Sequence, residues 1–289
     1  MASDAAVRLS DWKSTNVRIL AVVIALRAAA RVSPELAAAG LLRLFLTPRR
    51  HRVPERERAW VAGAAERRVR AAGRELRLWS WGDGPPVLLV HGWEGRGSQM
   101  GAFAAPLAAA GFRAVAFDAP GHGASDGERS SIPEMADAVA GVAALLGGVQ
   151  AVVAHTAGAA AASVALAAGT GAERLVYLAP PDDPVRFLRL AGAMVGLPPV
   201  VARHAQRRIE RRFDVSFDAF RGARLAPRIG LPLLAFHDPA DQEVPFDEAR
   251  ALVSHWPAAR LVPTPGLGHR RLLRDPEVVR QAVAFVAAG

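Results

Sequence analysis

Residues 149–168 read VQAVVAHTAGAAAASVALAA and carry the clearest signal of a strand followed by a helix. Its first seven residues form a short, largely apolar run, as expected of a strand that is buried on both faces of a parallel sheet. Residues 158–168 are rich in alanine, which has the highest helix propensity. Small residues surround Thr156 between these two halves, so the chain can turn sharply there from a strand into a helix.

Further strands and helices alternate on either side of this unit. Short apolar or alternating runs predict strands, and longer amphipathic or alanine-rich runs predict helices. The predicted strands are 74–81, 87–91, 113–118, 174–179, 231–237 and 260–263, and the predicted helices are 98–110, 133–146 and 275–287. This alternation predicts an α/β fold with a mostly parallel, doubly wound sheet that helices cover on both faces.

Residues 181–230 interrupt the alternation. They carry no strand signal and contain two helical patterns, at 184–195 and 200–213. Because the insertion follows the carboxyl end of a strand, where open α/β sheets bind their ligands, we predict a small helical lid. Its apolar residues suggest an acyl or alkyl site. An ordinary connecting pair of helices is the alternative.

Positive charge is concentrated near the start of the chain. The formal net charge is +9, and residues 1–80 hold 16 basic and 7 acidic residues. A basic segment can face anionic lipid or nucleic acid, but a solvated, arginine-rich helical surface is the simpler interpretation. We therefore expect no nucleic-acid partner, and we predict that residues 1–73 form a basic helical extension that packs on the core.

The extension contains one uncharged apolar run, at residues 19–26. Eight residues are far fewer than the ~20 that a membrane-spanning helix needs. We expect an amphipathic helix here that breaks near Ser33 and Pro34, and a further charged helix at residues 54–72. Peripheral contact with a membrane through the N-terminal helix is the alternative to packing on the core.

The composition limits the chemistry that the chain can carry out. About half of its 289 residues are apolar and none is cysteine, so neither a disulfide framework nor thiolate chemistry is available. The absence of cysteine fits a reducing compartment, and we expect a cytoplasmic protein. The eight histidines are scattered without a metal-binding pair, so we expect neither a metal nor another cofactor.

Five motifs follow the predicted strands. They are HGW at 91–93, DAPGHGAS at 118–125, AHTAG at 154–158, HDPADQEVP at 237–245 and GLGH at 266–269. In this order they resemble the α/β-hydrolase superfamily, with its oxyanion segment, D-x-P-G-H-G-x-S loop, nucleophile elbow, acid loop and histidine loop. The resemblance covers residues 74–289 and implies one α/β-hydrolase domain, with the lid insertion at about 181–230.

The resemblance implies roles for five residues. Thr156 has the position of the nucleophile, His269 that of the general base, and Asp241 that of the acid that orients the imidazole. The backbone N–H groups of Trp93 and Ala157 would form the oxyanion hole. No cofactor takes part in such a mechanism, and the partner is a small-molecule acyl substrate.

Other polar residues in these motifs have alternative interpretations. Asp238 is the competing acid, although the motif favours Asp241. His91 and His122 are expected to organise loops through hydrogen bonds, and Asp118 to satisfy loop backbone. Ser125 is interpreted as a turn residue, with a role as a substitute nucleophile as the alternative.

Thr156 departs from the family pattern, which has serine at the nucleophile position. The elbow residue adopts a positive φ, where a β-branched side chain is strained by about 1–3 kcal/mol. The extra methyl group can also crowd the path of attack or turn Oγ away from His269. The resemblance therefore implies a hydrolase of carboxylic esters or related acyl substrates with a Thr-His-Asp triad. The alternatives are a catalytically impaired or inactive protein that binds a ligand or partner, and a lipid-surface or partner-binding role led by the basic N-terminal segment.

Overall fold

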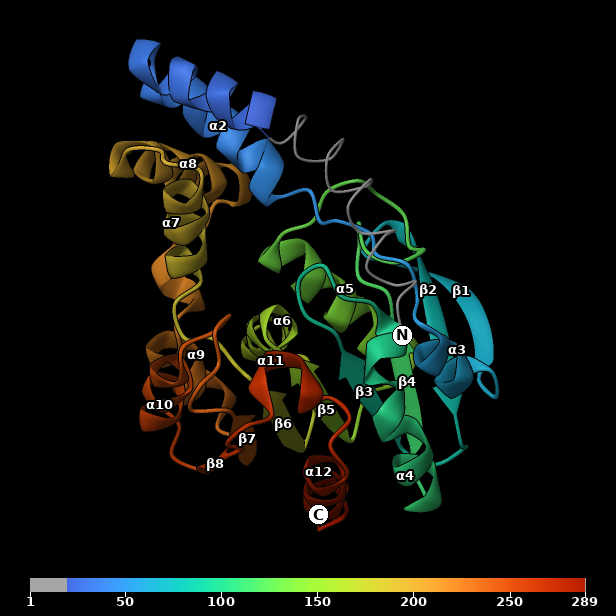
Figure 1. Ribbon diagram of the computed structural model, residues 1–289. Helices are drawn as coiled ribbons and strands as arrows, with labels where there is room; N and C mark the ends of the chain where they lie inside the picture. Colours follow the sequence, from blue (N-terminus) through green and yellow to red (C-terminus); the bar gives the residue numbers. More distant parts are fainter. Residues whose placement is uncertain (1–19, 289) are drawn as a thin grey trace, which may run out of the picture. The chain divides into compact units, whose positions relative to one another are not determined.

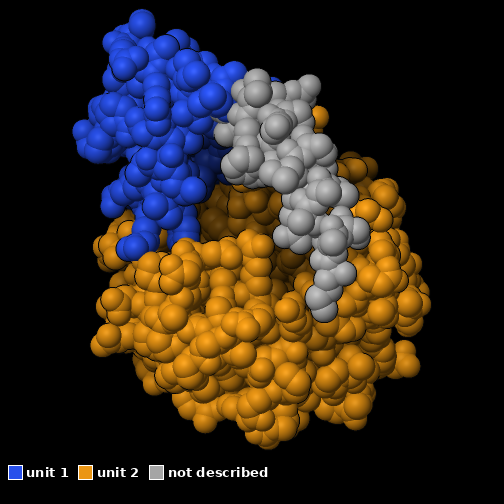
Figure 2. Space-filling model, in the orientation of Figure 1, with its two compact units in different colours: residues 1–45, 185–217 blue, residues 46–184, 218–289 orange. Residues whose placement is uncertain are grey.

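The computed structural model describes residues 20–288, which fall into two compact units. Unit 1 comprises the residues up to 45 together with 185–217, and unit 2 comprises residues 46–184 and 218 onward (Figure 2). The first 19 residues of the predicted N-terminal extension lie outside the described part. The predicted boundary at residue 73 and the predicted lid at about 181–230 stay predictions.

Unit 2 is built on one eight-stranded sheet with the order β1-β2-β4-β3-β5-β6-β7-β8 (Figure 1). The strands are β1 (Ala65–Ala71), β2 (Arg74–Trp81), β3 (Pro86–Val90), β4 (Arg113–Phe117), β5 (Ala151–His155), β6 (Arg174–Leu178), β7 (Leu233–His237) and β8 (Ala259–Pro263). Strands β3 to β8 run parallel, whereas β1 and β2 pair antiparallel. The predicted α/β-hydrolase architecture, with its mostly parallel, doubly wound sheet, is confirmed.

Helices cover both faces of this sheet. One face carries η1 (Gly97–Phe103), α4 (Ala104–Ala109) and α12 (Pro276–Ala287), and the other carries α5 (Ile132–Leu145), α6 (Ala157–Ala167), α9 (Gly222–Ile229) and α10 (Phe246–Ser254). The short elements α3 (Glu55–Val61), η2 (Phe217–Phe220) and α11 (Gly268–Arg271) lie in the connections. Because successive side chains of a strand point to opposite faces, Val87 and Leu89 of β3 join one hydrophobic cluster, while Leu88 and Val90 join the other.

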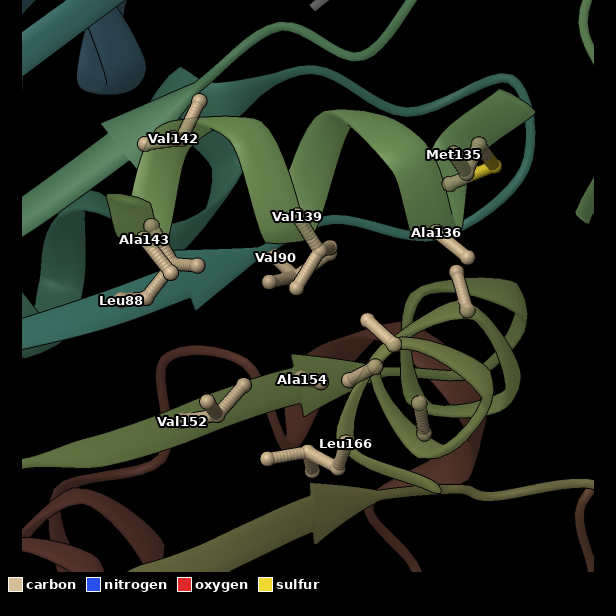
Figure 3. Packing of buried hydrophobic residues seen from close by; sticks show 14 of the residues in the cluster. Leu88, Val90, Met135, Ala136, Val139, Val142, Ala143, Val152, Ala154 and Leu166 are labelled. Atoms are coloured by element: carbon tan, nitrogen blue, oxygen red, sulfur yellow. The ribbon is translucent and has the colours of Figure 1, made fainter. Parts of the chain in front are cut away.

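The packing of α5 shows how the hydrophobic cluster that contains Leu88 and Val90 is built. Figure 3 shows α5 lying over β3 and β5, with Val139 directed at Val90 and Ala143 close to Leu88. These side chains are almost completely removed from water. Burial of each valine or leucine contributes about 1.5–3 kcal/mol to the free energy of unfolding. Ser131 caps the N-terminus of α5, because its hydroxyl accepts a hydrogen bond from Glu134 N.

Helix α6 packs closely against the sheet because its side chains are small. Nearly all of its residues are buried, and most of them are alanine. A Cβ atom on Gly158 would overlap with His91 O and would lie 2.8 Å from Val90 O, so only glycine fits at this point of contact. The strand and helix predicted from residues 149–168 are confirmed to within two residues at each boundary.

The prediction of one helix over residues 54–72 is wrong after residue 61. Residues 65–71 form the edge strand β1, which is joined to β2 by a two-residue turn at Ala72 and Gly73, where φ is 51° and 71°. Glu66 of β1 accepts two hydrogen bonds of 2.8 Å from Arg77 of β2. Most of β1 is exposed, so the strand lacks the apolar alternation that would have revealed it. Charge on an exposed edge also discourages pairing with another chain.

Unit 1 is helical in its described residues. Residues 20–32 form one helix and α2 (Pro34–Phe45) forms the next, so the predicted break near Ser33 and Pro34 is confirmed. The unit also contains α7 (Pro184–Met194) and α8 (Pro199–Phe213), and α2 packs on α8. A Cβ atom on Gly40 would overlap with Leu26, which brings the first helix close to α2. Within residues 20–288 no helix combines the length and the apolar character needed to cross a membrane.

A buried ion pair connects α3 to the segment that follows β3. Arg96 donates hydrogen bonds of 2.7 Å to both carboxylate oxygens of Glu57, and Ser98 Oγ donates to the same carboxylate at 2.8 Å. Both charged side chains are less than 10% exposed. Ion pairs of this kind are costly to break, because removal of one partner leaves a buried charge uncompensated.

Replacement of Glu57 by Gln should therefore destabilise unit 2. We expect the free energy of unfolding to fall by about 3–5 kcal/mol, because Arg96 keeps its charge and loses its partner. Urea denaturation followed by circular dichroism measures this change. The matched control is Glu55→Gln on the same helix, where the carboxylate is exposed, and its midpoint should stay unchanged. Equal midpoints for the two variants would contradict the prediction.

Candidate active site

The strand-to-helix turn places Thr156 in a strained conformation. Its φ is 43° and its ψ is −111°, so the expectation of a positive φ at this position is confirmed. Thr156 N donates a 2.9 Å hydrogen bond to Leu178 O of β6, and Thr156 O accepts one from Ala159 N. The turn is thus fixed from both sides, which is how a conformation that costs about 1–3 kcal/mol persists.

The methyl group of Thr156 lies against Gly92. A Cβ atom on Gly92 would overlap with Thr156 Cγ2, so glycine is required there by the threonine itself. Gly92 directly precedes Trp93, one of the two residues predicted to supply the oxyanion hole. The methyl group therefore faces the oxyanion segment. Among residues 20–288, no partner within hydrogen-bond distance of the Thr156 hydroxyl is found.

His269 and Asp241 come together although 28 residues separate them. His269 Nδ1 lies 2.8 Å from Asp241 Oδ2, and both side chains are buried. The other carboxylate oxygen, Oδ1, accepts hydrogen bonds from Glu243 N at 2.7 Å and from Val244 N at 3.0 Å. The carboxylate is therefore held in one orientation, and it fixes the imidazole with Nδ1–H as the donor.

The electrostatics of this pair favour an ionised carboxylate. Burial alone would raise the pKa of Asp241, but hydrogen bonds from His237, His269 and Val244 N outweigh it and hold this pKa below its usual value. His237 contributes at close range, with Nε2 3.4 Å from Asp241 Oδ2 and 2.9 Å from Val244 O. An ionised Asp241 stabilises a positive charge on His269, as a general base requires.

Two neighbours of His269 were not predicted from the sequence. Glu243 Oε2 lies 3.9 Å from His269 Nε2 and also pairs with Arg270. His155 is buried, with Nε2 3.1 Å from His269 O and its ring centroid 4.7 Å from that of His269. Burial, followed by the nearby His269, lowers the pKa of His155 well below its usual value. Only the position of His155 directly before Thr156 could have drawn attention to it.

Hydrogen bonds between the loops after β3 and β4 support the site. His91 Nδ1 bonds to Gly92 O at 2.7 Å, and His91 Nε2 accepts from Ala119 N at 2.9 Å. Asp118 accepts from Gly97 N at 2.7 Å and from Ala124 N at 2.8 Å. These contacts agree with the loop-organising interpretation of the histidine and the aspartate.

The two alternative site residues are occupied elsewhere. Asp238 accepts hydrogen bonds from Ala240 N, at 2.8 Å, and from Gly268 N, and its carboxylate makes no hydrogen bond to His269 in the described chain. Ser125 Oγ donates to Asp118 O at 2.6 Å and accepts from Arg77 N at 2.9 Å. Both atoms thus satisfy loop and strand backbone, as expected of turn residues.

The two residues predicted to supply the oxyanion hole are Ala157, next to the turn at Thr156, and Trp93, in the segment after β3. Ala157 is the first residue of α6, so its N–H group has no acceptor within the helix and points out of the helix N-terminus. Trp93 follows Gly92, and its ring meets that of His122 edge to face at 5.2 Å. In the described residues no group of three or more histidine, aspartate or glutamate side chains could hold a metal ion. The arrangement is suited to acyl transfer through a hydroxyl, an imidazole and backbone donors.

Comparisons with known proteins agree with this architecture. The family model described as serine aminopeptidase S33 matches residues 85–223. An esterase from Exiguobacterium antarcticum has a TM-score of 0.60 at 18% identity, covering 77% of this chain and 99% of its own. A thermophilic esterase from Thermogutta terrifontis has a TM-score of 0.57 at 20% identity, covering 76% and 96%.

A further similar structure extends over more of the chain. A membrane phospholipase A, described as a novel bacterial virulence factor, has a TM-score of 0.62 at 20% identity and covers 94% of this chain and 98% of its own. No curated protein sequence matches the chain. At these identities the similar structures establish the shared fold.

Buried histidines should make the stability of unit 2 sensitive to acid, and His91 and His122 add to the contribution of His155, whose pKa is also lowered by burial. Burial is the main cause that lowers the pKa of His91 to about 4 and that of His122 to about 3. The unfolded chain takes up these protons near pH 6.5, so stability is present at neutral pH and is lost as the pH falls below that value. We expect a loss of about 1.4 kcal/mol per pH unit for each histidine between about pH 6 and 4, measured by urea denaturation.

The variant His122→Asn should reduce this slope by one histidine's share. Asparagine retains a donor for Pro120 O, which His122 Nδ1 contacts at 2.9 Å, but does not titrate. The exposed His51 provides the control, and His51→Asn should leave the slope as it is. An unchanged slope in His122→Asn would refute the assignment.

The contact between Thr156 and Gly92 predicts a coupling between two substitutions. Gly92→Ala should destabilise the protein because the new Cβ atom meets Thr156 Cγ2, and in a Thr156→Ser background about 1–3 kcal/mol of this loss should disappear. The rest should persist, because His155 Nδ1 would lie 3.0 Å from the same Cβ atom. Gly63→Ala, where a Cβ atom meets open space, should show no coupling in the same denaturation experiment.

Proposed function

Because this chain is an α/β-hydrolase-fold protein, we propose that it hydrolyses carboxylic esters or related acyl substrates, with Thr156 as the nucleophile. The observation that carries the proposal is the buried 2.8 Å hydrogen bond from His269 Nδ1 to Asp241 Oδ2. A hydroxyl residue at φ 43° stands at the strand-to-helix turn, where this fold holds its nucleophile. Covalent acyl transfer uses a hydroxyl nucleophile, a base and an acid that orients the base.

The first half of the proposed reaction forms an acyl-enzyme. Thr156 Oγ attacks the carbonyl carbon of the ester while His269 Nε2 takes the hydroxyl proton. The carbonyl oxygen becomes an oxyanion, which the N–H groups of Trp93 and Ala157 stabilise. The tetrahedral intermediate then collapses. The carbon–oxygen bond to the alcohol breaks, and His269 returns its proton to the departing alkoxide.

The second half releases the acid. His269 takes a proton from a water molecule, which attacks the acyl-threonine carbonyl through the same oxyanion site. Collapse of this intermediate returns the proton to Thr156 Oγ and frees the carboxylic acid. Asp241 stays ionised throughout, in keeping with its lowered pKa, and stabilises the imidazolium that forms twice in the cycle. The sequence of steps needs no metal or cofactor.

Ester bonds are the favoured substrates for two reasons. The structures similar to this one include two proteins named as esterases and one named as a phospholipase A. The insertion at residues 181–230 also supplies apolar side chains suited to an acyl chain, as a lid would. We expect a small-molecule acyl substrate and activity in the cytoplasm, a compartment that fits the absence of cysteine.

A second candidate function has one specific observation in its favour. The Thr156 methyl group lies against Gly92, on the side of the oxyanion segment, and the hydroxyl makes no hydrogen bond to His269 among the described residues. A pocket retained in this state would bind an acyl ligand without turning it over. Hydrogen bonds of catalytic groups often tighten only when substrate binds, so ester hydrolysis remains our first proposal.

Substitutions at Thr156 separate the two candidates. If Thr156 is the nucleophile, hydrolysis of short-chain p-nitrophenyl esters should exceed that of Thr156→Ala and of Thr156→Val, which keeps the branched shape without the hydroxyl. Thr156→Ser should be faster than the natural protein by roughly 5- to 150-fold, because removal of the methyl group beside the oxyanion segment should lower the transition-state barrier by about 1–3 kcal/mol. The measurement is kcat/KM with purified protein.

The two candidate functions predict different rates for these variants. Activity in Thr156→Ser alone would favour the ligand-binding protein, and equal rates in the natural protein and Thr156→Ala would refute the threonine nucleophile. His269→Gln should remove activity from every active variant, because the base is shared. Leu145→Ser, an exposed substitution on α5, serves as the control for handling and folding.

A further inference from the structure

Unit 1 holds most of the charge excess of the protein and most of its exposed apolar side chains. Its 59 described residues contain ten arginines, all exposed, against three acidic residues. Nine large apolar side chains are exposed in the described chain, and all but Leu145 belong to this unit. The eight are Leu20, Val22, Ile24, Val32, Leu36, Leu44, Leu190 and Met194. The two properties therefore coincide in one small helical unit, coloured blue in Figure 2.

Helix α8 concentrates like charges on its exposed side. Five arginines lie within residues 203–212, and three pairs of them stand four residues apart: Arg203 with Arg207, Arg207 with Arg211, and Arg208 with Arg212. Like charges at this spacing on a helix repel one another and destabilise it. The single acidic residue of α8, Glu210, is already engaged by Gln206 and Phe217 N. An external anion would relieve this repulsion.

The exposed apolar residues share helix faces with arginines. In the helix over residues 20–32, Leu20 and Ile24 stand one turn apart and Arg31 lies on the same face, whereas Arg27 donates a 2.9 Å hydrogen bond to Val195 O. In α7, Leu190 and Met194 are one turn apart, and Met194 is 77% exposed. The opposite side of the first helix is the packed one, since Leu26 is buried against α2. Aliphatic side chains interleaved with arginines therefore face outward.

We propose that unit 1 binds the surface of a membrane that contains anionic phospholipid. Arginines can pair with lipid phosphates while leucine, isoleucine and methionine side chains enter the boundary between headgroups and acyl chains. A single-stranded nucleic acid would call for exposed aromatic side chains, whereas the large exposed residues here are all aliphatic. Pairing with unit 1 of a second copy would bring two strongly positive surfaces together. The proposal goes beyond ester hydrolysis and does not depend on it.

Co-sedimentation of the full chain with vesicles tests the proposal. We expect binding to vesicles of phosphatidylcholine mixed with phosphatidylglycerol, little binding to phosphatidylcholine alone, and weaker binding in high salt. Arg207→Gln with Arg211→Gln should reduce the partition coefficient by about fivefold per arginine, equivalent to about 1 kcal/mol each. Leu190→Ser with Met194→Ser should also weaken binding, because apolar contact is lost.

Matched substitutions in unit 2 provide the controls. Arg250→Gln with Arg280→Gln removes two exposed charges, and Leu145→Ser removes an exposed apolar side chain, so neither should change vesicle binding. Circular dichroism checks that each variant keeps its helical content. Binding that is equal for both kinds of vesicle, or that the unit 1 substitutions do not weaken, would overturn the proposal. It would also be overturned by preferential binding of an RNA oligonucleotide, or by self-association in sedimentation velocity without vesicle binding.

Discussion

The sharp turn at Thr156 governs the geometry of the candidate active site. A residue at φ 43° ends β5 and begins α6, so the side chain stands at the carboxyl edge of the sheet while the helix N-terminus opens beside it. The turn is feasible because small residues surround it. Gly158 lets α6 approach the end of β3, and alanines fill the rest of the contact. The approach places the Thr156 side chain at the strand-to-helix turn, where this fold holds its nucleophile.

The two sides of Thr156 are built differently. On one side, Asp241 is bound by two backbone N–H groups and by imidazole, and it fixes His269 firmly. On the other side, Gly92 accepts the threonine methyl group, which a side chain of any size would exclude. The methyl group thus lies beside the segment whose Trp93 N–H group we propose as an oxyanion donor. In the proposed mechanism, the rate therefore depends on whether this methyl group leaves room for the oxyanion.

The two units differ in net charge, and this difference does not follow the order of the residues in the sequence. Residues 1–80 contain the whole net charge, yet the basic residues of β1 and β2 are compensated within unit 2, for example by Glu66 with Arg77 and by Arg68 with Glu75. The arginines of α8 lie far along the chain but join the N-terminal helices in unit 1. Unit 1 is therefore strongly basic and unit 2 is almost neutral, so an anionic surface would attract unit 1 rather than unit 2.

The α/β fold, the strand-turn-helix unit around Thr156 and the candidate residues Asp241 and His269 could all be predicted from the sequence. Hydrophobic periodicity and the small residues of a tight turn involve residues close together in the chain, so both can be recognised in the sequence. Strand β1 was not predicted, because an exposed edge strand carries no alternation of apolar and polar residues. The contacts of His155 with His269 and of the threonine methyl with Gly92 were decided by the tertiary structure alone. They join residues far apart in the chain, which the fold brings together where β5 ends: His155 meets α11, and Thr156 meets the segment after β3.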